Sequence, residues 1–294
     1  MSYGSQRGSL RVEEAEVLAH SKHAGNQYVM RLRAPQIAAL AQAGAFVHVH
    51  CGAGLPMRRP MSIMRANRGD SWLDILYKAH GSGTRLLAAR KVGERLSLIG
   101  PIGVSFRQEA YRARPLLIGG GVGIPPILFL AEHMKQWEET VSPLVLMGSE
   151  VPFPFTARPS RILLRGMPEG VIAAMPLLED WNIASRLASL KGYPGCFEGY
   201  VTDLARHWLR TLEPDTIRND VEVFACGPTA MLKAVQKLAL DFALPCQLSL
   251  EEFMACAVGG CAGCSVRIET AAGPAMKRVC VDGPVFEAAS VVFS

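Results

Sequence analysis

The first third of the chain alternates apolar and polar positions in short runs, with turn residues between them. Runs of this kind lie at residues 11–19, 27–32, 46–50, 72–78 and 95–99. Alternation with a period of two predicts half-buried strands, and strands that follow one another this closely favour an antiparallel β-barrel. Helical spacing is scarce and is best developed at residues 35–43. We therefore predict a barrel domain over residues 1–108.

A different pattern begins after the barrel. Apolar runs at residues 144–148, 162–165 and 221–226 alternate with segments of helical periodicity at residues 127–138, 201–212 and 229–240. Strands that alternate with helices indicate an α/β domain with a parallel sheet, whose ligand is expected at the carboxyl ends of the strands. We predict this domain over residues 109–243, with an irregular stretch at residues 151–200 to which the sequence assigns no function. Residues 244–294 are expected to form a small third domain.

Composition narrows the class of protein. The chain has 294 residues, 49% hydrophobic and 19% charged, which suits a large core divided over two or three domains. The net charge of +5 comes without a basic run, so we predict neither a nucleic-acid nor a membrane partner. Residues 1–7 lack the apolar core of a signal peptide, and glycines and two prolines interrupt the apolar run at residues 116–131. We expect a soluble, cytoplasmic protein.

Four of the eight cysteines form a metal-binding pattern near the end of the chain. Cys256, Cys261 and Cys264 are separated by four and then two residues, and Cys280 follows downstream. This is the spacing of plant-type 2Fe–2S ferredoxins, in which four thiolates hold the cluster. The pattern therefore predicts an iron–sulfur cluster, which transfers one electron at a time.

Two other uses of these cysteines fit the spacing less well. A four-cysteine zinc site usually contains two CxxC pairs, whereas only Cys261 and Cys264 form one here. Disulfides are disfavoured because nothing in the sequence indicates export. The loop also contains three glycines that we expect to tolerate positive φ and to turn their N–H groups toward the sulfurs, namely Gly259, Gly260 and Gly263.

The barrel domain contains two candidate flavin-binding stretches. Arg59 and Ser62 place a cation and a hydroxyl three residues apart on an extended segment, where the arginine can pair with a phosphate and the serine can bond a flavin ring. Alone, this pattern is equally typical of a surface arginine before a strand. Residues 81–84 form a glycine-rich turn that opens a short helix, and N–H groups at a helix start can bind a pyrophosphate.

The α/β domain contains two candidate nucleotide-binding turns. Residues 114–130 read as a strand, a glycine turn and a helix, and the absence of bulky side chains lets a nucleotide approach the backbone. The order of the glycines is not GxGxxG, so the turn alone is a modest signal. Residues 225–228 end a second strand and begin another helix, which is also typical of an ordinary strand-to-helix turn.

Taken in order, these motifs resemble the ferredoxin-NADP reductase superfamily. The motifs are Arg59-Pro60-Met61-Ser62, Gly81-Ser82-Gly83-Thr84, the triple glycine before Pro125-Pro126, Cys226-Gly227-Pro228 and the four cysteines. The cysteine region is most similar to that of the electron transfer subunits of two-component, NAD-linked dihydroorotate dehydrogenases. The resemblance spans nearly the whole chain, and residues 151–200 fit it least.

The resemblance implies three cofactor sites. FAD is expected in the barrel domain, on Arg59, Pro60, Met61, Ser62, Leu76, Tyr77, Gly81, Gly83 and Thr84. NAD(H) is expected in the α/β domain, on Gly120, Gly121, Gly123, Pro125, Cys226, Gly227 and Pro228. The 2Fe–2S cluster is expected on Cys256, Cys261, Cys264 and Cys280. No acid–base residue is expected to be essential, because the cofactors supply the chemistry.

The resemblance also implies a function and a partner. NADH would reduce FAD, and FAD would release single electrons to the cluster. A flavin-bearing (β/α)8 domain needs some 250 residues, which this chain does not offer. Dihydroorotate oxidation, a step of pyrimidine biosynthesis, is therefore expected in a catalytic FMN subunit bound to this chain. Alternatives are a reductase serving a hydrogenase, a sulfite reductase or a ferredoxin, and a non-catalytic zinc module.

The choice between NAD and NADP depends on residues just after the strand at 144–148. Glu150 could accept a hydrogen bond from a ribose 2′-hydroxyl, which favours NAD. Arg158 and Arg161 could instead pair with a 2′-phosphate. We expect NAD.

Overall fold

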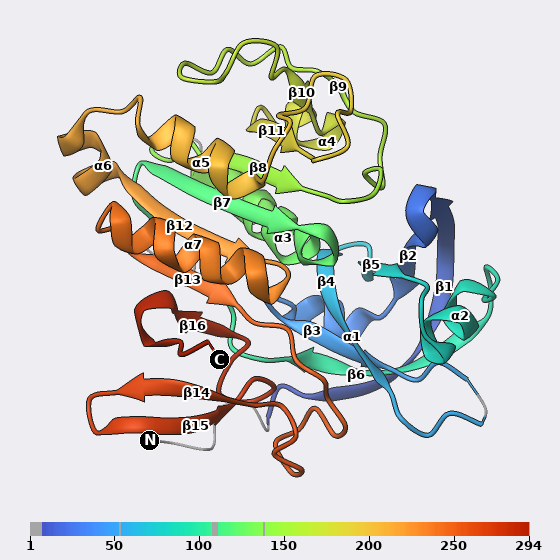
Figure 1. Ribbon diagram of the computed structural model, residues 1–294. Helices are drawn as coiled ribbons and strands as arrows, with labels where there is room; N and C mark the ends of the chain where they lie inside the picture. Colours follow the sequence, from blue (N-terminus) through green and yellow to red (C-terminus); the bar gives the residue numbers. More distant parts are fainter. Residues whose placement is uncertain (1–7, 53, 108–110, 138, 294) are drawn as a thin grey trace.

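The first domain is a closed barrel of six antiparallel strands (Figure 1). The computed structural model describes residues 8–52, 54–107, 111–137 and 139–293. In the order β1-β2-β5-β4-β3-β6, the barrel strands are β1 (Arg11–His23), β2 (Gln27–Arg33), β5 (Trp72–Lys78), β4 (Arg59–Asn67), β3 (Phe46–Val49) and β6 (Arg95–Ile102). The predicted barrel is confirmed.

Short helices close the barrel and link its strands. They are η1 (Ala24–Asn26), α1 (Pro35–Leu40) and α2 (Ser82–Ala88). The helix predicted at residues 35–43 ends at Leu40 because the chain turns there, with the N–H of Ala45 donating to the carbonyl of Gln42. In β4, the pairing with β5 shifts register between Ile63 and Arg65. Such a bulge changes the direction in which the following side chains point.

The second domain contains a six-stranded sheet, parallel except for its last strand. In the order β11-β8-β7-β12-β13-β16, its strands are β11 (Ala184–Ala188), β8 (Leu144–Gly148), β7 (Arg114–Gly120), β12 (Val221–Cys226), β13 (Cys246–Ser249) and β16 (Val285–Glu287). The predicted α/β class is confirmed. All carboxyl ends of the five parallel strands lie at the same edge of the sheet.

The strand predicted at residues 162–165 is wrong, and β11 occupies the place beside β8. Leu163 is 98% exposed, so this apolar run does not enter the core. The buried guanidinium of Arg186, in β11, instead donates to the carbonyl of Ile162 at 2.9 Å and holds the run as a loop. The stretch 151–200 also contains β9 (Arg158–Pro159), β10 (Ala173–Ala174) and α4 (Pro176–Asp180).

Helices cover both faces of the sheet. On the face toward the barrel lies α3 (Ile124–Met134), preceded by η2 (Gly121–Gly123) and followed by η3 (Lys135–Trp137). On the other face lie α5 (Val201–Leu209) and α7 (Thr229–Asp241), and α6 (Pro214–Asp220) leads into β12. The three predicted helices are therefore present with shifted ends, and residue 138 of the first lies outside the described residues.

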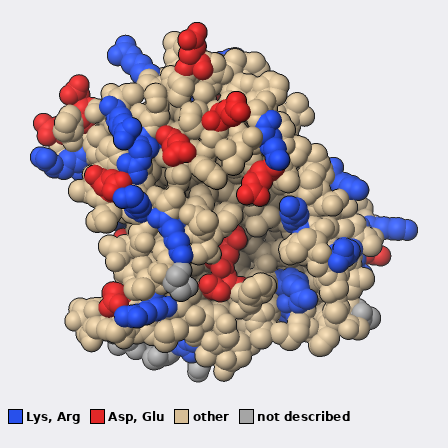
Figure 2. All heavy atoms as spheres, in the orientation of Figure 1, with Lys and Arg blue, Asp and Glu red and all other residues tan. Residues whose placement is uncertain are grey.

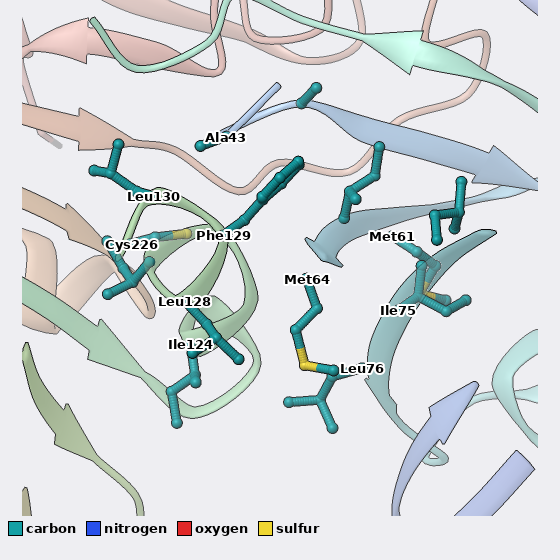
Figure 3. Packing of buried hydrophobic residues seen from close by; sticks show 14 of the residues in the cluster. Ala43, Met61, Met64, Ile75, Leu76, Ile124, Leu128, Phe129, Leu130 and Cys226 are labelled. Carbon is teal, nitrogen blue, oxygen red and sulfur yellow. The ribbon is translucent and has the colours of Figure 1, made fainter. Parts of the chain in front are cut away.

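Two hydrophobic clusters form the core, one on each face of the sheet. Alternate sheet residues separate between them, since Leu117 belongs to the barrel-side cluster and Leu116 and Ile118 to the other. The barrel-side cluster runs without interruption from the barrel strands through α3 to the sheet (Figure 3). The barrel and the six-stranded sheet therefore pack against opposite sides of α3 through one continuous hydrophobic cluster.

The cysteine segment leaves the sheet between its last two strands. After β13 the chain passes through the cysteine loop and the hairpin of β14 (Ser265–Thr270) and β15 (Gly273–Arg278), and then returns as β16 and η4 (Ala288–Ser290). Gln236 of α7 donates to the carbonyls of Ala288 and Val291, at 2.6 and 2.8 Å, and so fastens the returning chain. β13 and β16 fall within the predicted third domain, residues 244–294, but both belong to the sheet of the second domain. The domain boundary at residue 244 therefore stays a prediction. Among the described residues, no helix is both long and apolar enough to cross a membrane.

Candidate functional site

The cysteine loop turns backbone N–H groups toward two of its sulfurs. Cys256 Sγ accepts from the N–H of Cys261 at 3.4 Å, and Cys261 Sγ accepts from the N–H of Gly263 at 3.4 Å. Partial burial raises the pKa of the Cys256 thiol, but hydrogen bonds from the loop backbone outweigh it and lower that pKa to about 7. The loop thus favours a thiolate before any metal is considered.

The expectation for the loop glycines is only partly correct. Gly259 has φ of 82°, as predicted, but Gly260 and Gly263 do not adopt positive φ. Ala257 and Ala262 do so instead, at 56° and 55°. A Cβ at Gly263 would lie 3.6 Å from Cys261 Sγ, an ordinary van der Waals contact, so space alone does not require glycine there. The predicted N–H contacts are present for all three glycines, with Gly263 donating to Cys261, Gly260 to Cys256 and Gly259 to Cys280.

Cys264 and Cys280 form the inner part of the cysteine set. Their side chains are 3% and 1% exposed and lie against each other. Burial, and then the neighbouring Cys264, raise the pKa of Cys280 to about 12. Arg278 Nη1 donates to the carbonyl of Gly259 at 2.9 Å, which ties the loop to the segment that contains Cys280.

The donor set fits a two-iron cluster. The structure brings the cysteines together as two pairs, Cys256 with Cys261 and Cys264 with Cys280. Within the described residues, no three His, Cys, Asp or Glu side chains converge closely enough to hold a single metal ion as they stand. A 2Fe–2S cluster has two metal atoms to share among four thiolates, so its ligands need not meet at one point.

The two predicted flavin stretches lie together on the barrel. The side chain of Arg59, at the start of β4, crosses Gly83 in α2, where an added Cβ would lie 3.0 Å from Arg59 Nε and 3.3 Å from Cys51 Sγ. Among the described residues, no carboxylate lies within ion-pair distance of Arg59, whose Nη1 donates only to the carbonyls of Met57 and Arg58. This is a cation without an anion beside a helix start, which suits a phosphate.

The hydroxyl of Thr84, a predicted flavin residue, is already used in hydrogen bonds within the protein. Its Oγ1 accepts from the N–H groups of His80 and Gly81, both at 3.1 Å, and donates to the carbonyl of Gly81 at 3.2 Å. The hydroxyl therefore caps α2. The N–H groups of the first turn, at Ser82 and Gly83, have no acceptor within the helix.

Three of the predicted flavin residues are buried in the barrel. Tyr77 is 2% exposed, stacks on Tyr28 with ring centroids 5.5 Å apart, and has its hydroxyl 2.8 Å from His20 Nε2. Burial raises the pKa of the Tyr77 hydroxyl. Met61 and Leu76 belong to the barrel-side core. Of the predicted flavin residues on β4, Arg59, Pro60 and Ser62 are half-buried, so their side chains can reach a cofactor.

The two predicted nucleotide turns pack directly against each other. A Cβ on Gly123 would lie 2.5 Å from the carbonyl carbon of Cys226 and the nitrogen of Gly227, and a Cβ on Gly227 would lie 3.2 Å from the Cα of Gly120. These three glycines are required by packing. Gly121 differs, because it has φ of 54° and open space around it. It is the glycine at which a ligand can approach the backbone.

The nucleotide turns also lie beside the barrel. The turn η2 packs against β5, and α3 packs against β4. Pro125 is buried in the first turn of α3, where its missing N–H costs nothing. Pro228 ends the second turn as the residue before α7. The structure therefore joins the flavin strands and the glycine turn, which lie far apart in the sequence.

Cys226 lies at the carboxyl end of β12 and is 1% exposed. Its thiol donates weakly to Glu251 Oε1 at 3.9 Å, and burial together with this carboxylate raises its pKa well above the usual value. Glu251 was not predicted as part of the site. The only sequence signal for it is its place two residues after β13, at the edge where ligands of parallel sheets bind.

One of the two arginines considered as 2′-phosphate ligands, Arg158, is engaged elsewhere. Arg158 Nη2 donates to Asp180 Oδ1 at 2.5 Å and to the carbonyl of Pro176 at 3.0 Å, so its guanidinium is bound to α4. Arg161 and Glu150 are exposed. Of the three residues, Glu150 follows β8 most closely and keeps its predicted place near the ligand edge.

Comparison with solved structures defines the class of fold. The chain superimposes on an NADH-dependent reduced ferredoxin-NADP oxidoreductase with a TM-score of 0.75 at 23% identity, covering 95% of this chain and 90% of that one. It also superimposes on a ferredoxin NADP+ reductase from Neisseria gonorrhoeae solved with FAD and NADP, with a TM-score of 0.57 at 15% identity, covering 79% and 91%. The fold is that of the ferredoxin-NADP reductase flavoproteins.

Sequence comparison identifies the family within that class. Residues 251–292 match the model of the iron–sulfur cluster binding domain of dihydroorotate dehydrogenase B. The chain is 32% identical to the dihydroorotate dehydrogenase B (NAD(+)) electron transfer subunit of Desulforamulus reducens, over 96% of this chain and 99% of the relative. It is 31% identical to that of Geobacillus sp. strain WCH70, with the same coverage. The chain belongs to this family of electron transfer subunits, as the resemblance predicted.

Proposed function

We propose that this chain passes electrons between NAD(H) and an FMN-containing subunit by way of FAD and a 2Fe–2S cluster. The electrons run toward NAD+ when that subunit oxidises dihydroorotate, and from NADH when it reduces orotate. When bound, FAD accepts a hydride from the nicotinamide and releases single electrons to the cluster. The observation that supports this function best is the contact between the glycine turn η2 and β5, the strand that contains the predicted flavin residues Leu76 and Tyr77. The contact supports the proposal because residues predicted to bind FAD and residues predicted to bind NAD(H) then lie side by side.

The chain's own residues would bind and orient the cofactors. Arg59 supplies an unpaired cation for the FAD phosphates, and Ser62 supplies a hydroxyl for the ring. Gly121 leaves the backbone open to the nucleotide, whereas Gly123 keeps the two turns together. We expect no side chain to transfer a proton in the redox step.

A direct contact also joins the barrel to the cysteine segment. The N–H of Val104, just after β6, donates to the carbonyl of Gly283 at 2.6 Å, three residues after Cys280. A Cβ on Gly103 would collide with Pro284, so the two segments touch without an intervening side chain. This contact supports a short route from a flavin on the barrel to the cluster.

NADH should be the better donor. The 2′-phosphate of NADPH would meet the carboxylate of Glu150 while Arg158 is held by Asp180. We expect the bound flavin of the isolated chain to be bleached by NADH under anaerobic conditions at least tenfold faster than by NADPH, and the isolated chain not to oxidise dihydroorotate. A flavin that stays oxidised with NADH, or dihydroorotate oxidation without a partner, would contradict the proposal.

The partner is expected to bind over the cysteine loop. Cys261 is exposed, and three large apolar side chains of the same segment are exposed with it: Phe253 at 94%, Met276 at 65% and Val258 at 47%. Large apolar residues in contact with water are typical of interaction sites. On the face in Figure 2, acidic and basic side chains are interspersed rather than gathered by sign. The exposed cysteine and these exposed apolar side chains thus belong to the same segment of the chain.

Phe253 should be the main anchor of this interface. A buried aromatic anchor contributes about 2 kcal/mol or more, so Phe253→Ser should weaken binding of the FMN subunit about 30-fold. Binding can be measured by titration of the purified subunits. NADH reduction of the bound flavin should be unchanged. Leu163→Ser is the matched control, because Leu163 is 98% exposed in the α/β domain. Equal binding by both variants would exclude this surface.

A further inference from the structure

A salt bridge joins the barrel to the helix that begins at the glycine turn. Arg65, in β4, donates to Glu132, in α3, with Nη2 to Oε1 at 2.6 Å and Nε to Oε1 and Oε2 at 3.1 and 3.2 Å. Both side chains are largely buried, at 21% and 24% exposed. Several donors on one carboxylate fix the direction of the contact as well as its length.

Two tryptophans hold the Arg65 guanidinium from both domains. Its Cζ lies 5.4 Å from the ring centre of Trp72 in the barrel and 5.1 Å from that of Trp181, which follows α4. Lys135, at the end of α3, lies over the same Trp181 ring at 5.1 Å. A cation over an indole ring is attracted to it. Trp181 therefore contacts both Arg65 of the barrel and Lys135 of α3, and so helps to hold the barrel and the helix together.

One face of α3 connects the salt bridge to the glycine turn. Ile124, Leu128 and Glu132 recur every four residues and therefore point the same way. Figure 3 shows Leu128 directed toward Met64 and Leu76 of the barrel, and Ile124 belongs to the same barrel-side cluster. Apolar packing near the turn is not directional by itself. The salt bridge, about 12 Å further along the helix, is directional and so adds a fixed point between α3 and β4.

We propose that Arg65 is a positioning residue for hydride transfer. It fixes α3, and with it the glycine turn η2, against β4 and β5, the two strands that contain predicted flavin residues. This proposal rests on the proposed function. If the contact is lost, α3 can shift along β4, and Gly121–Gly123 moves relative to β5. A displacement of the order of 1 Å between reacting groups can slow a reaction about a hundredfold.

Arg65→Met tests the proposal, since it keeps the length of the side chain and removes its charge and donors. In anaerobic stopped-flow mixing with NADH, we expect the limiting rate of flavin reduction to fall tenfold or more. The Kd for NADH should change less than threefold, and the long-wavelength charge-transfer absorption between nicotinamide and flavin should weaken. FAD and iron contents should match those of the wild type. Arg65→Lys, with charge but no fork, should give an intermediate rate.

Glu132→Met provides the second variant, because it removes both acceptor oxygens of the same contact from outside the barrel. It should slow reduction as Arg65→Met does, and the double variant should be no slower than either single variant, since the two residues act as one contact. Reduction within twofold of the wild-type rate in both single variants would overturn the proposal. Loss of FAD from both would also overturn it, because Arg65 would then be a structural support. A wild-type flavin that NADH does not reduce would instead overturn the proposed function.

Discussion

Cys264→Ser should remove the iron–sulfur cluster and abolish electron transfer to the FMN subunit, while NADH still reduces the bound flavin. Cys264 is 3% exposed and lies against Cys280, so a serine fits the space but offers an oxygen in place of a soft thiolate. Iron content and the visible spectrum measure the loss of the cluster. Electron transfer should fall to background, because the exposed end of the electron path is missing.

Cys196→Ser is the matched control for that experiment. Cys196 is another thiol without a disulfide partner; it is half-buried and lies in the loop after β11, outside the cysteine segment. This variant should keep its full iron content and activity. If Cys196→Ser lost iron as Cys264→Ser did, or if Cys264→Ser kept the cluster, the predicted ligand set would be wrong.

Gly123→Ala should abolish the reduction of the flavin by NADH. The new Cβ would lie 2.5 Å from backbone atoms of Cys226 and Gly227, and backbone cannot move aside as a flexible side chain can. The two nucleotide turns must therefore separate. We expect the rate of flavin reduction to fall at least a hundredfold, in line with the loss expected from misplaced reactants. FAD should remain bound, since the barrel is not altered.

A glycine in open space provides the control. Gly192 has φ of 62° and nothing within 4 Å of an added Cβ, so Gly192→Ala introduces only the local strain of a left-handed alanine. Its rate of flavin reduction should equal that of the wild type. A normal rate in Gly123→Ala would show that the turns do not have to touch for nucleotide binding.

The cofactor motifs were predictable because each depends on a few neighbouring residues. The spacing of the four cysteines and the order of the glycine turns are local properties, and they led to the correct family. The roles of individual residues within these motifs were harder to predict from the sequence. Gly120 and Gly123 face another turn rather than open space, and that contact comes from a segment about a hundred residues further along the chain.

The strand beside β8 was missed because its composition is misleading. β11 has the sequence Ala-Ser-Arg-Leu-Ala, and both Ser185 and Arg186 are buried. Arg186 is tolerated there because it donates to three carbonyls, those of Ile162, Val171 and Ser185. The apolar run at residues 162–165 is more strand-like in sequence but lies outside the sheet. Which of the two segments joins the sheet depends on hydrogen bonds between residues far apart in the sequence. The contact of Arg65 with Glu132 is of the same long-range kind and could not be predicted from local sequence either.

The placement of the cysteine segment between β13 and β16 makes it a separable cassette. Ser249 and Val285 are paired residues of adjacent strands, and the N–H of Leu250 donates to the carbonyl of Pro284 at 2.9 Å. The entry and exit of the cassette are thus neighbours in one antiparallel ladder, which a tight turn could equally join. A reductase of this architecture can therefore gain or lose a metal relay without reordering the sheet that binds its nucleotide.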